Sequence, residues 1–246
     1  MKVALFIPCY VDQFYPKAAI ATLELLEKFG LEVSYPKNQT CCGQPMANSG
    51  FEHLTKGCNN LFVQNFLGYD YIVCPSGSCV MHIKDHLHTE ENEAAAQDIR
   101  TKVYELTEFL VDVLKIEKLE ASFPHKVGLH QSCHGQRGLK LSQMTELMAE
   151  PFSKPGHLLS MVNGLELVEL DRKDECCGFG GTFCVTEEAV SVKMGKDRVL
   201  DHERNGAEYI TAGDLSCLMH MEGILKRRGS KVKIIHIAEI LNHHLS

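Results

Sequence analysis

The chain has 246 residues, enough for two domains of ordinary size, and its 44 % hydrophobic and 23 % charged residues are typical of a globular protein. The formal net charge is −7 and no long basic run occurs. We therefore expect no nucleic-acid partner, because phosphate binding needs a face rich in Lys and Arg. The apolar stretch at 3–7 is shorter than the core of a signal peptide, and no apolar run approaches the roughly 18 residues of a membrane span. These features predict a cytoplasmic protein with no membrane span.

Short apolar runs alternate with helical patterns along the whole chain. The first part is expected to hold strands at 2–7, 31–35, 69–73 and 102–105, and helices at 18–29, 51–66 and from about residue 79. The second part is expected to hold strands at 126–131, 166–170, 208–211 and 232–235, and helices at 139–149, 186–204 and 218–227. Strands that alternate with helices favour parallel sheets in an α/β fold.

Four blocks of sequence recur in the same order in the two parts. KVALFIPC resembles KVGLHQSC, CCG occurs twice, YIVCPSGSCVMH matches YITAGDLSCLMH, and YELTEFL echoes IHIAEIL, at offsets between 124 and 138 residues. We infer an internal duplication that gives two homologous, Rossmann-like halves. The first repeat is predicted at 1–120 and the second at 121–246, joined near 117–125, where charged residues and Pro124 interrupt the pattern.

The chain contains eleven cysteines, an odd number, without the pattern of an exported protein. In a reducing compartment, clustered cysteines more often indicate metal or redox chemistry than structural disulfides. We interpret Cys58 and Cys184, which stand alone, as small buried hydrophobic side chains.

Eight cysteines follow predicted strands in the same places of the two halves. They form two sets: Cys9, Cys41, Cys42 and Cys79, then Cys133, Cys176, Cys177 and Cys217. Because the carboxyl ends of parallel strands meet at one sheet edge, we expect each set to converge there, beside helix N-termini that stabilise thiolates. Four thiolates suit a tetrahedral metal ion or an iron–sulfur cluster. Adjacent cysteines favour a cluster with several metal atoms, and the glycine after each pair allows unusual φ values.

The spacing Cys–x31–Cys-Cys-Gly–x35–Cys, followed by Cys–x42–Cys-Cys-Gly–x38–Cys, resembles the paired cysteine-rich CCG domains. Such domains occur in the cysteine-rich subunit of heterodisulfide reductase, in glycolate oxidase iron–sulfur subunits and in lactate-utilisation proteins. Phrases such as CCGQP, PSGSC, CCGFGGTF and HIAEIL most resemble the lactate-utilisation protein A family, over essentially the whole chain. The resemblance implies one or two [4Fe–4S] clusters in an electron-transfer subunit of an oxidoreductase. Such a subunit works beside other iron–sulfur subunits of a complex that oxidises L-lactate to pyruvate.

The chain departs from this resemblance at one position in each half. In heterodisulfide reductase each repeat ends CxxC and supplies five thiolates, whereas Ser76 and Asp214 stand at the first of those cysteines here. Cys74 and Asp214 are further candidate ligands, and Asp214 is alternatively the N-cap of a helix. His130, near Cys133, is interpreted as part of a local polar lining.

Two other functions stay open at this point. One is a scaffold subunit in which zinc occupies one or both sites, since four cysteines form closed structural zinc sites. The other is a thiol–disulfide redox protein similar to heterodisulfide reductase. No acid–base pair indicates where lactate would lose its protons, so no catalytic residue is assigned, and we expect no complete dehydrogenase activity from this chain alone.

Overall fold

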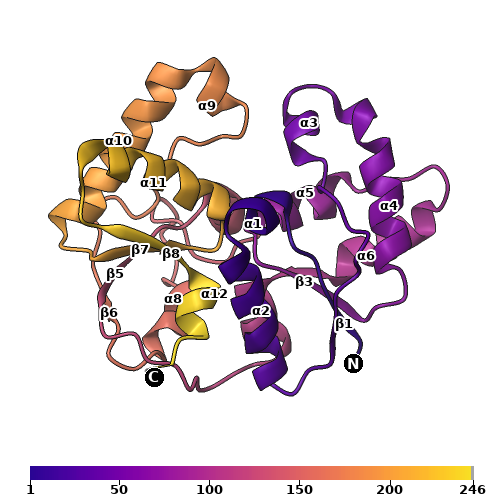
Figure 1. Ribbon diagram of the computed structural model, residues 1–246, viewed down its shortest axis with the longest axis horizontal. Coiled ribbons are helices and arrows are strands. Elements are labelled where there is room, and N and C mark those ends of the chain that lie inside the picture. The colour runs from indigo at the N-terminus through magenta and orange to yellow at the C-terminus, as the bar shows by residue number, and fades with distance from the viewer. Residues whose placement is uncertain (245–246) are drawn as a thin grey trace.

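The computed structural model describes residues 1–244, and its α/β fold contains two sheets of four parallel strands (Figure 1). The first sheet has the order β2-β1-β3-β4, with β1 at Val3–Leu5, β2 at Val33–Ser34, β3 at Tyr71–Cys74 and β4 at Val103–Glu105. The second has the order β6-β5-β7-β8, with β5 at Lys126–Leu129, β6 at Glu166–Leu167, β7 at Tyr209–Ala212 and β8 at Lys233–His236. The predicted α/β class and the parallel pairing are confirmed.

Helices connect these strands in a similar order in the two halves. The first half contains α1 at Cys9–Phe14, α2 at Pro16–Lys28, α3 at Gln44–Asn48, a 3-10 turn at Glu52–Thr55, α4 at Lys56–Phe66, α5 at Gly77–His86, α6 at Glu93–Lys102 and α7 at Leu106–Glu108. π-helical turns follow at Phe109–Val113 and His134–Gly138. The second half contains α8 at Lys154–Ser160, α9 at Phe183–Thr186, α10 at Glu188–Arg204, α11 at Leu215–Arg228 and α12 at Ile237–Leu241.

The two sheets repeat each other in local detail. Strand β4 leads into a helix capped by Glu105, whose side chain accepts N–H groups while Glu108 reaches back to the Glu105 N–H. Strand β8 leads into α12 with the same reciprocal capping by His236 and Glu239. The recurrence of YELTEFL as IHIAEIL therefore corresponds to one repeated strand-to-helix turn.

Alternating side chains on β1 show how the first sheet is covered on both faces. Val3 and Leu5 belong to a core that also contains residues of the second half, such as Val127 and Ile210. Ala4 and the following Phe6 face the opposite core. Because successive strand side chains point to opposite faces, a continuous apolar run such as VALF matches a parallel sheet buried on both sides.

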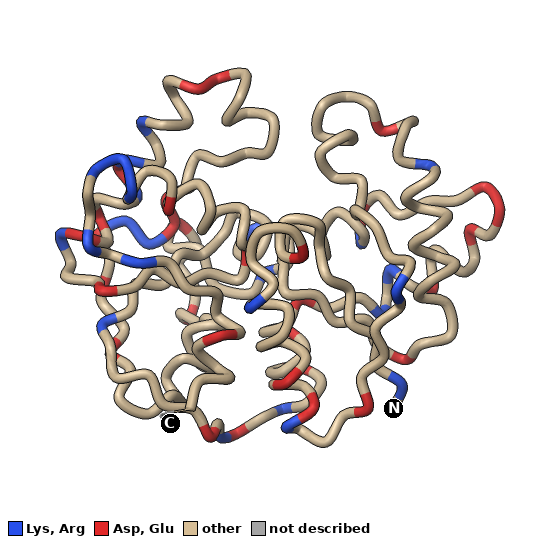
Figure 2. The backbone as a smooth tube through the Cα atoms, in the orientation of Figure 1, with Lys and Arg blue, Asp and Glu red and all other residues tan. Residues whose placement is uncertain are grey.

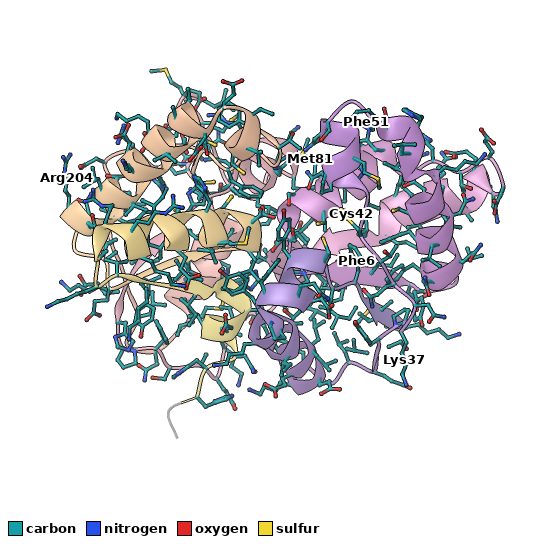
Figure 3. The ribbon with its side chains drawn as sticks, turned by 45° about the horizontal axis from the view of Figure 1, so that its top comes forward. Phe6, Lys37, Cys42, Phe51, Met81 and Arg204 are labelled. Carbon is teal, nitrogen blue, oxygen red and sulfur yellow. The ribbon has the colours of Figure 1, made fainter. Side chains whose placement is uncertain are left out.

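The two halves pack against each other at a junction that includes α2 and α12. Helices α2 and α12 lie side by side at the junction (Figure 1), and Tyr15 Oη donates a hydrogen bond of 2.7 Å to Glu222 Oε2 across it. Met81 of α5, labelled at the junction in Figure 3, packs against Gly138, where an added Cβ would lie 2.0 Å from the Met81 sulfur. The glycine at position 138 therefore leaves room for the Met81 side chain at this contact between the halves.

The predicted helix at 139–149 is wrong. The segment is irregular, Lys140 takes a left-handed φ of 55°, and Ser142 forms an antiparallel bridge with Ser153 before α8 begins. The Thr145 N–H donates to Asp174 Oδ2 at 2.6 Å instead of to a helical carbonyl. The apolar residues of this segment do not share one buried face, since Met148 is fully exposed.

Within residues 1–244, no helix combines the length and the apolar character needed to cross a membrane. Acidic residues are spread over both halves, whereas Lys and Arg gather where α11 ends and β8 begins (Figure 2). Part of this basic group is paired, since Lys226 contacts Glu222 and Arg228 contacts Glu203.

Candidate metal centres

The first set of cysteines converges at the carboxyl ends of three neighbouring strands. Cys9 opens α1 after β1, Cys41 and Cys42 lie in the loop after β2, and Cys79 lies in the first turn of α5 after β3. The Cys9 and Cys41 sulfur atoms are 3.8 Å apart, and the Cys42 thiol interacts with those of Cys41 and Cys79. Successive contacts between thiols therefore link all four cysteines, from Cys9 to Cys79.

The second set repeats this arrangement on the other sheet. Cys133 follows β5, Cys176 and Cys177 follow β6, and Cys217 lies in the first turn of α11 after β7. The Cys176 sulfur interacts with the thiols of Cys133 and Cys177, and Cys177 contacts Cys217. The structure brings together both predicted sets, and their role as metal ligands remains a prediction.

One sulfur atom in each set is favoured as a thiolate. Hydrogen bonds from the thiols of Cys42 and Cys9 lower the pKa of Cys41, and those from Cys133 and Cys177 lower the pKa of Cys176. The backbone N–H two residues on contributes in each case, at 3.4 Å from the sulfur. Metal binding requires thiolates and releases the remaining protons, so this donor set fits a metal ion or cluster.

The glycine after each cysteine pair is required by backbone conformation. Gly43 has a φ of 91° and Gly178 a φ of 85°, both in the left-handed region where a Cβ causes strain. At Gly178 the space is also closed, because an added Cβ would lie 2.6 Å from the Ser191 carbonyl oxygen. The repeated CCG sequence therefore encodes a tight turn that aims an N–H at the first sulfur of the pair.

Both sets line one cavity of about 320 Å³ between the halves. Its wall includes Tyr10, whose ring lies edge-on to Phe179 of the other half with centroids 6.1 Å apart. Gln44 and His134, also from opposite halves, approach to 3.4 Å between side-chain nitrogens. The two candidate metal centres thus share one cavity.

The two further candidate ligands lie in different surroundings. Cys74 is completely buried in the apolar core of the first half, with its thiol 3.7 Å from the Ser76 carbonyl oxygen. Asp214 lines the cavity, and its carboxylate accepts hydrogen bonds from Ser76 Oγ at 2.8 Å, the Ser78 N–H at 2.9 Å and the Ser132 hydroxyl. Asp214 occupies the N-cap position of α11, but its side chain caps α5 of the other half.

The two isolated cysteines are each partly exposed. Cys58 lies on α4, whereas Cys184 lies in α9 on the wall of the shared cavity, where its thiol donates to the Gly181 carbonyl at 3.0 Å. The interpretation of Cys184 as a buried hydrophobic side chain missed this position, because only the folded loop after the second CCG brings it to the cavity.

His130 is the residue that sequence reasoning underestimated. It is 1 % exposed, and one of its ring nitrogens lies within 4.8 Å of the sulfur atoms of Cys177 and Cys217. Burial, and then the nearby Arg198 charge, lower the pKa of His130 to about 3, so the imidazole is neutral at physiological pH. The one available signal was the alignment of the repeats, which places His130 where the first half has Phe6.

Comparisons with known proteins agree with this arrangement. A family model described as a cysteine-rich domain, CCG, matches residues 3–84 and 127–222. Lactate utilization protein A of Halalkalibacterium halodurans is 41 % identical over 99 % of this chain and 97 % of its own length. The protein of the same name from Macrococcus caseolyticus is 43 % identical over 100 % of this chain and 98 % of its own.

A solved structure shares the fold. A hypothetical protein from Helicobacter pylori superposes with a TM-score of 0.63 and 14 % identity, covering all of this chain and 49 % of that chain. This chain therefore spans about half the length of that neighbour, and the likeness concerns the fold alone. The identity of the curated relatives extends over the full chain, and both CCG segments contain the paired cysteines described above. The chain therefore belongs to the lactate utilization protein A family and carries two CCG cysteine-rich domains.

Proposed function

We propose that this chain is an iron–sulfur electron-transfer subunit of a complex that oxidises L-lactate to pyruvate. The observation that carries the proposal is the pair of four-thiol sets on one cavity between two similar halves. The names of the curated relatives support the link to lactate. The two halves are proposed to be repeats divided near residue 120, the second running to 246, of which residues 245 and 246 lie outside the described part.

Two centres that each transfer one electron suit a reaction that releases two electrons. Oxidation of lactate to pyruvate releases two electrons and two protons, and an iron–sulfur cluster supplies one-electron transfer when bound. Two centres in one chain can accept both electrons one at a time. The chain's own contribution is to hold each centre with four sulfur atoms and to direct the N–H groups of Gly43 and Gly178 at sulfur.

Asp214 gives this pair of sites a fixed geometry. Its carboxylate connects Ser76 and Ser78 of the first half to Ser132 of the second, and it is 1 % exposed. Hydrogen bonds to a buried carboxylate are stronger than those between neutral groups. This carboxylate therefore ties the two halves together beside both sets of cysteines.

The partners proposed are other iron–sulfur subunits of the same complex, and the compartment proposed is the cytoplasm. All eleven cysteines are free thiols, which suits a reducing compartment. The cavity lies between the halves and is open to solvent, so electrons could leave toward a partner there.

Metal and sulfide analysis of anaerobically prepared protein, with electron paramagnetic resonance, tests the proposal. We expect about four irons with matching sulfide for each occupied site. Cys41→Ser should remove the first centre and Cys176→Ser the second, while Cys58→Ser, a partly exposed cysteine outside both sets, should leave the metal content unchanged. Zinc without iron in both sites would contradict the proposal and favour a scaffold. Lactate oxidation by the isolated chain would contradict the role of a subunit.

A further inference from the structure

The side chains behind the two candidate centres, on the side away from the cavity, differ in polarity. In the first half, Phe6 packs edge-on against Phe62 and Phe66 of α4, with ring centroids 5.0 and 5.7 Å away. Phe6 and Cys42, both labelled in Figure 3, belong to the same buried hydrophobic cluster of this half. The first centre is thus backed by aromatic hydrocarbon.

Polar groups occupy the same places in the second half. The repeat alignment puts His130 at the position of Phe6, and α10, the counterpart of α4, carries Arg198 and His202 at the same four-residue spacing. All three side chains are buried, Arg198 and His202 completely. A cation and two imidazoles therefore replace three phenyl rings behind the second centre.

Arg198 is held in one orientation by several acceptors. Its Nη1 donates to the Arg172 carbonyl at 2.6 Å and to Asp201 Oδ2 at 3.1 Å, and its Nε donates to His130 Nδ1 at 3.1 Å. A guanidinium keeps its proton in proteins, so a positive charge is fixed between the Asp201 carboxylate and the His130 ring. The His130 ring that Arg198 contacts also has a nitrogen within 4.8 Å of the sulfur atoms of Cys177 and Cys217.

The contact with Arg198 determines which nitrogen of His130 carries the proton. Because Arg198 is a donor only, His130 Nδ1 must accept, and a neutral ring then bears its hydrogen on Nε2. A protonated Nε2 has no lone pair for a metal. Metal-binding histidines show the reverse pattern, with the second nitrogen donating to a carboxylate or carbonyl. The Nε2 of His130 is therefore arranged as a hydrogen-bond donor rather than as a metal ligand.

We propose that His130 and Arg198 make the second metal centre the more easily reduced of the two, with His130 as a hydrogen-bond donor to its sulfur and Arg198 as the residue that positions it. The inference deepens the proposed function and rests on it. Reduction adds negative charge to a cluster, and hydrogen bonds to sulfur together with a nearby buried cation stabilise that charge. Each centre also has one histidine of a repeated pair nearby, His82 beside Cys41 and His220 beside Cys176, so this pair does not distinguish them. The three phenyl rings behind the first centre supply neither a cation nor a hydrogen bond.

The consequence is a direction for electrons inside one chain. An electron shared by the two centres resides mainly on the second, near α10 and α11. We expect its preference for the second centre to be about tenfold or more, which corresponds to a potential difference of about 59 mV or more for a one-electron couple.

Anaerobic redox titration of the full chain, followed by electron paramagnetic resonance, measures both potentials. Cys41→Ser and Cys176→Ser identify which signal belongs to which centre. His130→Phe recreates the first-half residue and should lower the potential of the second centre, leaving the first unchanged. The double variant Arg198→Gln/Asp201→Asn removes both charges together, which avoids an unpaired buried ion, and should shift the same potential downward.

Two control variants separate this effect from simple repacking. His202→Phe changes a buried imidazole on α10 that has no hydrogen bond to His130, and should leave the second potential unchanged. Phe6→Leu alters packing behind the first centre without removing a donor, and should leave the second potential unchanged as well.

The outcomes are distinct. Equal potentials in the unaltered protein, or an unchanged second potential in His130→Phe with normal iron content, would overturn the inference alone. Selective loss of iron from the second site in His130→Phe would also overturn it, because it would make His130 a ligand. Absence of iron from both sites would overturn the proposed function and this inference with it. If His130→Phe does not fold, the double variant decides the question by the same measurement.

Discussion

Replacing Gly178 by Ala should destabilise the protein far more than the same change at two other left-handed glycines, Gly229 and Gly43. Gly178 has a φ of 85°, and an added Cβ would lie 2.6 Å from the Ser191 carbonyl oxygen and 2.8 Å from Met194 Cβ. The left-handed conformation costs about 1–2 kcal/mol for a residue with a Cβ, and overpacking adds about 1–3 kcal/mol. We therefore expect Gly178→Ala to lower the free energy of unfolding by about 2–5 kcal/mol.

Two other glycines separate the conformational cost from the clash. Gly229 has a φ of 64° with nothing within 4 Å of an added Cβ, so Gly229→Ala should show only the conformational cost. Gly43 has a φ of 91°, and its Cβ would meet side-chain carbons of Thr55 at 3.1 Å, a milder contact than the 2.6 Å at Gly178. Gly43→Ala should therefore lie close to Gly229→Ala. The entropy that alanine removes from the unfolded chain is common to all three variants and cancels in the comparison.

Urea unfolding of the metal-free protein under reducing conditions measures these differences as shifts of the midpoint at constant slope. Asparagine sharpens the test, because it tolerates left-handed φ but still carries a Cβ. Gly229→Asn should be close to the unaltered protein, and Gly178→Asn should remain strongly destabilised. The reasoning is refuted if Gly178→Ala is as stable as Gly229→Ala.

Three further changes should alter stability in defined directions. Asp214→Ala removes the acceptor of three buried donors and should lower the free energy of unfolding by about 3 kcal/mol or more, measured by urea unfolding. Burial raises the pKa of Glu105 to about 7 from 4.5, so the folded state binds this proton more tightly than the unfolded state. Stability from this proton is therefore present below pH 4.5 and is lost as the pH rises to 7, by up to about 3 kcal/mol, and Glu105→Gln should flatten this dependence. His202→Phe should raise the thermal midpoint, because both buried ring nitrogens of His202 have no partner in the structure and each unpaired polar group costs about 1–3 kcal/mol.

Each of these changes has a result that would contradict it. Asp214→Ala with unaltered stability would mean that water replaces the carboxylate between the halves. A pH profile that is identical for Glu105→Gln and the unaltered protein between pH 4.5 and 7 would place the titration elsewhere. A lower thermal midpoint for His202→Phe would show that the larger ring does not fit beside Gly128, where an added Cβ would already lie 2.1 Å from His202 Nδ1.

Local sequence determined the elements whose signals are short-range. The apolar run at 2–7 predicted a strand, and Val3–Leu5 forms it, because a parallel sheet buries both faces of such a run. The helix predicted at 18–29 is observed at Pro16–Lys28, and Gly30 follows it with a φ of 75°. The helix predicted at 139–149 failed for the opposite reason, since its conformation depends on contacts with distant residues such as Asp174.

The sequence by itself determined that the chain is a duplicated α/β protein and that eight cysteines stand at strand ends, because periodicity and repeat spacing are recorded in chain order. The tertiary structure alone decided that both sets face one cavity, that Asp214 caps a helix of the opposite half, and that His130 and Arg198 lie behind the second set. These are relations between segments separated by tens of residues. Residue identity does not encode them, since they arise when sheets and helices pack and bring distant side chains within hydrogen-bonding distance.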